Sequence, residues 1–303
     1  MQNSEIARRV MLASLKISIW YARRFDAQAT SEVERQYKTP GAGRFNKRLL
    51  PDNSPEYKVV TSVAAHIRDE YYRYTLEYDP RRVRLMPADV YLEFAASLRK
   101  LSAEFDQAKH DFLRAYPDLR ERARSELNGL YSEDDYPTVE KLATKFGVHL
   151  SVLPFPDASQ FGIDFPPDIL KGIKDDIDSQ VMNAISSATD ELMARLFDTV
   201  AKLSARLNGS QEVRLDVLNG LRDVVGLLPK LNFAGDSMLD HLLSDAKENL
   251  TRYSAAAIKE SSVLRSEVAQ KAADLQQLMA AYMGSPPVAA PASSDAMFFK
   301  LAA

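Results

Sequence analysis

The sequence contains no cysteine and little glycine. Without a thiol among its 303 residues, it cannot form disulfides, thiolate zinc sites or cysteine nucleophiles. The lack of cysteine also fits a reducing compartment, where disulfides are rare. Only 11 residues are glycine, whereas Ala, Leu, Glu, Lys, Arg and Gln, which lose little side-chain freedom in a helix, are plentiful. The composition therefore predicts a mainly α-helical fold.

Long apolar runs are also missing. No stretch approaches the roughly 18 apolar residues that a membrane-spanning helix needs. The apolar run 10–15 is interrupted by Lys16 and has no small-residue cleavage site after it, so we interpret it as part of a helix and not as a signal peptide. These features predict a cytoplasmic protein without a membrane partner.

The usual patterns of catalytic and metal sites do not occur. None of the four histidines has a histidine partner at helical i,i+4 spacing. The segment 39–44 has two glycines but lacks the Lys-Ser/Thr pair of a P-loop. The acidic runs 133–135 and 174–178 lack the pattern of a calcium loop, and solvated helix ends explain them better. We therefore expect a non-enzymatic protein with no metal and no cofactor; an acidic metal site built from distant residues is a remote alternative.

Hydrophobic spacing predicts helices along most of the first 155 residues. The expected helices cover 4–24, 56–78, 87–116, 117–128 and 138–146. Only the segment 148–153 alternates as a strand does. We expect an N-terminal helical domain over 1–155 with at most a short strand or hairpin, and with a basic loop over 36–56 that is rich in proline and glycine.

The second half is expected to consist of long helices. Prolines at 154, 156, 166 and 167 mark a junction at 156–167, and apolar residues then recur every three or four positions over 168–283. Two of three expected helices are about forty residues long, which is typical of a helical hairpin or three-helix bundle and of an oligomer interface. We therefore expect a homo-oligomer.

Residues 284–303 read as a flexible, disordered tail. They are rich in Pro, Ala and Ser and cannot pack a core of their own. The apolar tip of this tail, with Phe298, Phe299 and Leu301, is a candidate docking peptide for a partner or a neighbouring subunit. The alternative is that the tip folds back onto its own domain.

Positive charge is concentrated at the front of the chain. Residues 1–50 hold ten Lys or Arg against four Asp or Glu, a balance of +6 within a chain of net charge −3. The candidate nucleic-acid-binding residues are Arg35, Tyr37, Lys38, Arg44, Phe45, Lys47, Arg48, Arg81, Arg82 and Arg84. Cations that follow phosphates and rings that stack on unpaired bases bind single-stranded nucleic acid in a salt-dependent way. A solvated surface is the alternative for the loop, and core packing is favoured for the tyrosines over 71–78.

Several segments resemble known families. Leu15–Trp20 with the following Arg23-Arg24, the helix over 98–115 and the segment 148–155 resemble an uncharacterised family of phage and proteobacterial proteins. Its genes often lie beside those of MoxR-type AAA+ ATPases and von Willebrand A-domain proteins. The helical second half and the Pro/Ala tail are similar to single-stranded-DNA-binding transcription cofactors of lytic phages, which implies a phage RNA polymerase as partner. The tail departs from ordinary single-strand binders because its only acid is Asp295.

Two functions follow as expectations. The first is a phage-encoded, non-enzymatic single-stranded-DNA-binding protein that supports transcription or replication in the host cytoplasm. In it, Arg44, Lys47 and Arg48 neutralise phosphates, while Tyr37 and Phe45 stack on bases. The alternative is a helical adaptor or scaffold for an AAA+ ATPase and a von Willebrand A-domain partner, with the long helices as the interface.

Overall fold

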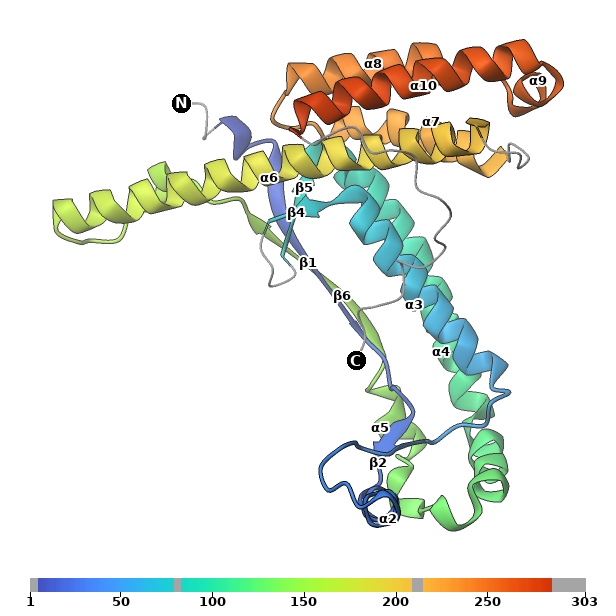
Figure 1. The fold of residues 1–303 in the computed structure, drawn as a ribbon. Helices are drawn as coiled ribbons and strands as arrows, with labels where there is room; N and C mark the ends of the chain where they lie inside the picture. The colour runs from blue at the N-terminus through green and yellow to red at the C-terminus, as the bar shows by residue number, and fades with distance from the viewer. Residues whose placement is uncertain (1–4, 79–82, 209–214, 285–303) are drawn as a thin grey trace. The chain divides into compact units, whose positions relative to one another are not determined.

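The computed structural model describes residues 5–78, 83–208 and 215–284. Most of these residues are helical, so the predicted mainly α class is confirmed (Figure 1). Five of the candidate residues discussed above are therefore not placed. Arg81, Arg82 and the tail tip with Phe298, Phe299 and Leu301 lie outside the described residues.

The chain forms two units that alternate along the sequence. One unit consists of residues 13–74 and 91–152, and we call it the ribbon unit after the β-ribbon it carries. The other consists of 1–12, 75–90 and the chain from 153 onward, and we call it the bundle unit. Segments 1–12 and 75–90 thus group with the second half of the chain.

Residues 10–18 form a strand, so the helix expected over 4–24 is wrong. Strand β1 (Val10–Ser18) lies within a sheet of order β4-β5-β1-β6. The sequence signal is the alternation of apolar Leu15, Ile17 and Ile19 with polar residues, which has the period of a strand. The expectation of at most one short strand or hairpin is also wrong.

The other strands of this sheet are short, apart from the last. They are β4 (Leu76–Glu77), β5 (Arg84–Pro87) and β6 (Gly147–Pro154). Strand β6 confirms the strand predicted at 148–153. Strands β4 and β5 form an antiparallel hairpin, with Leu76 opposite Leu85.

Two helices and an aromatic cluster make the core of the ribbon unit. They are α3 (Pro55–Tyr74) and α4 (Ala88–Leu127). The ring of Phe112 lies 5.4 Å from that of Tyr57, 6.0 Å from that of Tyr116 and 5.6 Å from that of Phe146. Trp20 meets Tyr116 edge-on at 5.7 Å, so the single tryptophan is a core residue. Such ring pairs add to the stabilisation from their burial.

Helix α4 corrects the boundary that was expected at Tyr116-Pro117. The helix continues through Pro117, which removes one backbone N–H but does not end it. The buried side chains of Phe112, Tyr116 and Leu119 on both sides of the proline hold the two parts to the same core. Tertiary packing therefore outweighs the local cost of the proline.

A short helix, α2 (Ala27–Tyr37), was missed by the sequence analysis. The Asp26 carboxylate accepts a hydrogen bond from the backbone N–H of Ala29 and caps its N-terminus at 2.9 Å. The helix ends at Lys38, whose φ of 54° is left-handed. A second short helix, α5 (Val139–Ala143), precedes β6 and lies within the helix predicted at 138–146.

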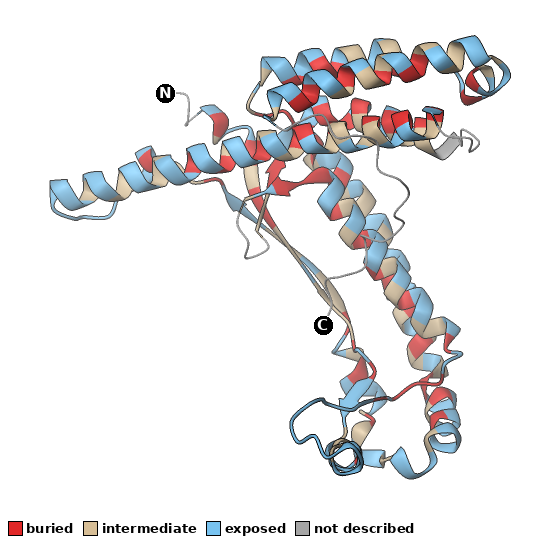
Figure 2. Cartoon of the chain, in the orientation of Figure 1, coloured by how far each residue is buried: buried red, intermediate tan, exposed pale blue. Residues whose placement is uncertain are grey.

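Most of the bundle unit consists of helices that run side by side. Its long helix α6 (Pro167–Asn208) confirms the prediction for that segment. It packs against α7 (Leu215–Leu231) and α10 (Ser262–Tyr282), and α8 (Ser237–Leu250) packs against α7 and α10 (Figure 1). Buried residues recur along the sides of these helices that face one another (Figure 2).

Of the two helices of about forty residues expected over 168–283, the second is wrong, because no continuous helix forms there. The chain breaks into α8, a short α9 (Ala255–Glu260) and α10. The hydroxyls of Ser254 and Ser261 accept hydrogen bonds from the N–H groups of Ala257 and Leu264, at 3.1 and 3.2 Å. Because such side-chain caps begin new helices, the chain can reverse and form a bundle that includes α8 and α10 as neighbours.

An ion network attaches the β4–β5 hairpin to α6. The Glu191 carboxylate accepts from Arg84 at 2.8 Å, from Arg195 at 2.6 Å and from the backbone N–H of Glu77 at 2.6 Å. Burial raises the pKa of Glu191, but the charges of Arg195 and Arg84 outweigh it and hold the pKa below its usual value. Arg84 therefore has a structural role in the bundle unit.

Among the described residues, no helix combines the length and hydropathy needed to cross a membrane.

Candidate nucleic-acid interface

Two short strands of the ribbon unit form an antiparallel β-ribbon. Strand β2 (Arg23–Phe25) pairs with β3 (Asn46–Arg48), so that Arg23 faces Arg48, Arg24 faces Lys47 and Phe25 faces Asn46. Directly opposed residues share a face, and successive residues alternate between faces. Arg23, Arg48, Phe25 and Asn46 thus occupy one face, the outer face, and Arg24 and Lys47 occupy the inner face.

The outer face of the ribbon combines cations with an aromatic ring. The guanidinium of Arg44, from the turn before β3, lies 4.5 Å from the centre of the Phe25 ring. The Phe25 side chain is 40% exposed, and Arg23 and Arg48 are exposed beside it. Arg48 contacts the carboxylate of Asp52, but both side chains are mostly solvated, which makes this a weak ion pair.

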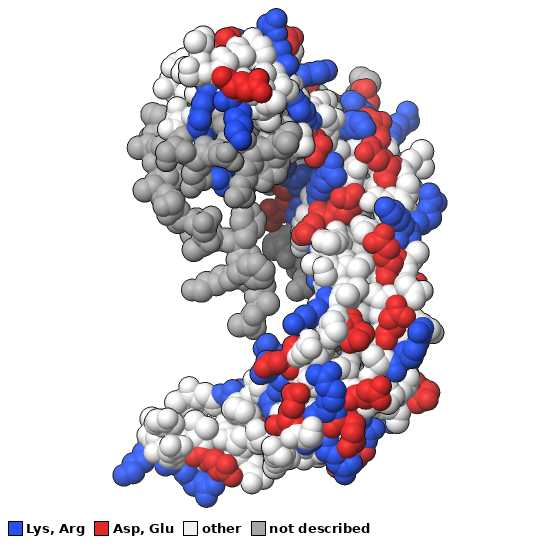
Figure 3. Space-filling view, turned by 90° about the vertical axis from the view of Figure 1, so that its right-hand side faces the viewer, with Lys and Arg blue, Asp and Glu red and all other residues white. Residues whose placement is uncertain are grey.

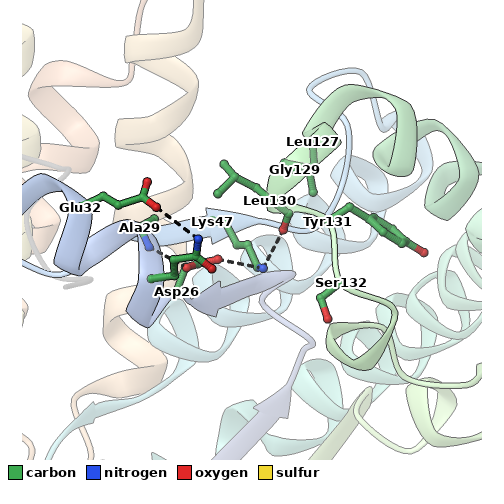
Figure 4. A pocket seen from close by; sticks show the side chains of 10 residues that line it. Asp26, Ala29, Glu32, Lys47, Leu127, Gly129, Leu130, Tyr131 and Ser132 are labelled. Carbon is green, nitrogen blue, oxygen red and sulfur yellow. Dashed lines mark hydrogen bonds and ion pairs between the residues drawn. The ribbon is translucent and has the colours of Figure 1, made fainter.

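Lys47 on the inner face is buried, and its ammonium group binds other groups of the protein. Its ammonium lies 2.9 Å from Asp26 and 2.7 Å from the carbonyl oxygen of Leu130 (Figure 4). It also lies 2.8 Å from Asp135. Three acceptors match the three N–H donors of an ammonium. Lys47 is therefore a structural cation and does not belong among the phosphate-binding residues expected from the sequence.

The surroundings of Lys47 and Asp26 favour the charged form of each. Burial lowers the pKa of Lys47, but hydrogen bonds to Asp135 and Asp26 outweigh it and hold the pKa above its usual value. The hydrogen bond from the Ala29 N–H, followed by the one from Lys47, lowers the pKa of Asp26. Arg24 extends the network, since its Nε lies 3.5 Å from Asp135.

The segment between α2 and β3 is held against the helix. The Glu34 carboxylate accepts a hydrogen bond from the N–H of Gly41 at 2.7 Å, and the Thr30 hydroxyl accepts one from Phe45 N–H at 3.0 Å. These contacts correct the predicted basic loop over 36–56. Within that range Tyr37 ends α2, a three-residue strand forms, and Pro55 begins α3.

The remaining candidates of this segment are exposed. Tyr37 is 67% exposed at the end of α2, Lys38 caps that helix, Arg35 lies one turn earlier, and Phe45 is 38% exposed. The ribbon unit therefore presents several cations and rings from two adjoining elements. Arg23 and Phe25 were missed in the sequence. The signal was the basic-aromatic run at 23–25, but its strand partner could not be recognised.

In the second basic-aromatic segment, of which residues 68–78 and 83–84 are described, Tyr71 and Tyr74 are packed into the core. The hydroxyl of Tyr71 donates to the carbonyl of Ala13 at 2.8 Å, and that of Tyr74 donates to Glu93 at 2.8 Å. Arg73 lies 3.6 Å from Glu70. On the face of the molecule that Figure 3 presents, Lys and Arg are intermingled with Asp and Glu.

A polar cavity adjoins the inner face of the ribbon. Its volume is about 480 Å³. One wall is the first turns of α2, the opposite wall is the turn after α4, and Lys47 lies between them (Figure 4). The residues that line it are Asp26, Gln28, Ala29, Glu32, Lys47, Leu127, Gly129, Leu130, Tyr131 and Ser132.

Within the described residues, no three His, Asp or Glu side chains are grouped so that they could hold a metal ion. Comparison of the chain with models of known protein families, with curated proteins and with solved structures gives no significant match. The family resemblances described above stay predictions, and a functional proposal rests on the site alone.

Proposed function

We propose that this protein binds single-stranded nucleic acid through the outer face of the β2–β3 ribbon. The observation that carries the proposal is the grouping of Arg23, Arg44 and Arg48 around the exposed ring of Phe25. In a chain of net charge −3, this cluster of exposed cations favours a polyanionic ligand.

The exposed rings favour a single strand over a duplex. The faces of bases are stacked on one another inside a duplex, whereas unpaired bases can stack on protein rings at about 1–3 kcal/mol each. Phe25, Phe45 and Tyr37 supply such rings beside the cations. As expected from the sequence, the protein would serve phage transcription or replication, and the long-helix bundle would organise a homo-oligomer.

Filter binding tests this function. We expect a labelled single-stranded oligonucleotide to be retained at low salt, with an affinity that falls steeply as salt rises because bound phosphates release counterions. A single-stranded competitor should displace it at lower concentration than a duplex of equal length. No retention, or an affinity indifferent to salt, refutes the proposal.

A second candidate function, an adaptor for an AAA+ ATPase and a von Willebrand A-domain protein, is favoured by one feature of α6. The N-terminal part of this helix exposes apolar side chains, with Ile169 53% and Met182 56% exposed (Figure 2). Binding of either partner in a pull-down after nuclease treatment, lost when Ile169 is changed to Asp, supports the adaptor function. If the Ile169→Asp variant still binds the partner in the pull-down, this interface is contradicted.

A further inference from the structure

The cavity beside Lys47 contains a donor and an acceptor side by side. Gln28 and Glu32 are one turn apart on α2, and the Gln28 Nε2 donates to Glu32 Oε1 at 3.2 Å. A carboxylate only accepts hydrogen bonds, so the amide must turn its NH₂ group toward it. This arrangement leaves the second amide hydrogen and the remaining carboxylate lone pairs to meet a ligand in the cavity.

In the order Gln28 and then Glu32, the cavity offers one hydrogen-bond donor followed by hydrogen-bond acceptors. The Watson–Crick edge of guanine has the matching order, with the O6 acceptor followed by the N1–H and N2–H donors. Adenine and cytosine place a donor where guanine has O6, and thymine has one donor between two acceptors. A guanidinium has donors alone and leaves the Gln28 N–H without an acceptor.

The charges of the cavity also favour a base over a phosphate. Asp26 and Glu32 are acidic, and the ammonium of Lys47 is already bound by Asp26, Asp135 and the Leu130 carbonyl. A phosphate would be repelled here, whereas the neutral edge of a base can donate to the carboxylate. The volume of about 480 Å³ lies within the range of small-ligand sites, about 300–1,000 Å³.

The cavity and the proposed phosphate-binding face share one strand. Lys47 contributes its side chain to the cavity, while its neighbours Asn46 and Arg48 point to the outer face. A strand whose phosphates contact the outer arginines can therefore turn one base around the ribbon toward the cavity. We propose that this cavity binds an unpaired guanine of the single strand, an inference that rests on the proposed function.

Fluorescence anisotropy with four oligonucleotides tests the inference. Each is a thymidine oligomer, and the central position is dT, dA, dG or deoxyinosine, which lacks the N2 amino group. We expect the dG oligomer to bind about tenfold more tightly than the dT oligomer, because one well-formed bidentate contact discriminates by about that factor. The deoxyinosine oligomer should lie between them.

Variants of α2 assign the preference to the cavity. Glu32→Gln and Gln28→Ala should abolish the preference for dG. The matched control is Gln36→Ala, since Gln36 is an exposed glutamine of the same helix and does not line the cavity. Circular dichroism of each variant verifies that α2 and the rest of the fold remain.

The outcomes separate the two proposals. Salt-dependent binding of all four oligomers without a preference for dG overturns the guanine site and leaves the proposed function standing. If the folded Glu32→Gln variant still prefers the dG oligomer, the preference arises outside the cavity, and the guanine site is again overturned. Binding of none of the oligomers refutes the proposed function and the guanine site together.

Discussion

Lys47 and Arg48 are adjacent cations with opposite roles, and replacing each with Met separates them. The Lys47 side chain is 8% exposed and bound to two carboxylates, whereas that of Arg48 is 61% exposed beside a solvated aspartate. Methionine retains most of the apolar stem of either residue, so the substitution mainly removes the charge. We expect Lys47→Met to lower stability and Arg48→Met to lower nucleic-acid affinity.

The magnitude follows from burial. Removing one partner of a buried ion pair costs about 3–5 kcal/mol, because the remaining charge is left without compensation. The lower end applies here, since Asp135 keeps a contact with Arg24 and Asp26 keeps the Ala29 N–H. We therefore expect a loss of about 3 kcal/mol for Lys47→Met. For Arg48→Met the loss should be below about 1 kcal/mol, as for exposed pairs.

Urea denaturation, monitored by tryptophan fluorescence, measures the stability of both variants. The protein has one tryptophan, Trp20, and it is 9% exposed in the aromatic core of the ribbon unit. Its emission therefore reports the unfolding of the unit that contains the ribbon. Equal stability of the two variants refutes the structural role of Lys47, as does a Lys47→Met protein that is fully stable but defective in binding.

Three further predictions concern other residues. Because folding lowers the pKa of Glu191, the ionised carboxylate stabilises the protein fully above its unfolded-state pKa of about 4.3, and this stabilisation is lost as the pH falls through the folded-state pKa. Acid denaturation should therefore show a weaker pH dependence in the Glu191→Gln variant. Burial raises the pKa of Tyr116 to about 12, so stability should fall as the pH rises from about 10 to 12, and Tyr116→Phe should reduce this dependence in alkaline denaturation. Phe25→Ala should weaken single-strand binding by about 1–3 kcal/mol in filter binding and leave the urea midpoint unchanged; unchanged affinity excludes stacking on this ring.

The helical second half was predictable where a single pattern dominates. Over α6, apolar residues recur at every third or fourth position, and the expected helix agrees with the observed one. The break between α8 and α10 was missed because apolar residues such as Leu250, Leu264 and Leu275 keep recurring on both sides of it. At Ser254 and Ser261, each capping hydrogen bond forms when its serine is extended and not helical, so the local sequence permits both outcomes.

The candidate site was predictable in composition but not in geometry. The basic-aromatic character of 35–48 was visible from the residues, and its exposed members remain candidates. The pairing of Arg23 with Arg48 depends on a contact between residues 25 positions apart, which no local pattern encodes. The burial of Lys47 likewise depends on Asp135, which is distant in sequence.

The salt dependence of single-strand binding in two triple variants tests the central claim most directly. One variant removes the outer-face charges, Arg23→Gln/Arg44→Gln/Arg48→Gln. The charge-matched control is Arg99→Gln/Lys100→Gln/Arg114→Gln, which removes three exposed cations of α4 in the same unit.

The account predicts that the slope of log affinity against log salt falls by about 2 in the ribbon variant, since each phosphate contact to a single strand contributes about 0.7. The control should keep nearly the wild-type slope. Equal slopes in the two variants, whether both reduced or both unchanged, contradict binding by the outer face of the ribbon.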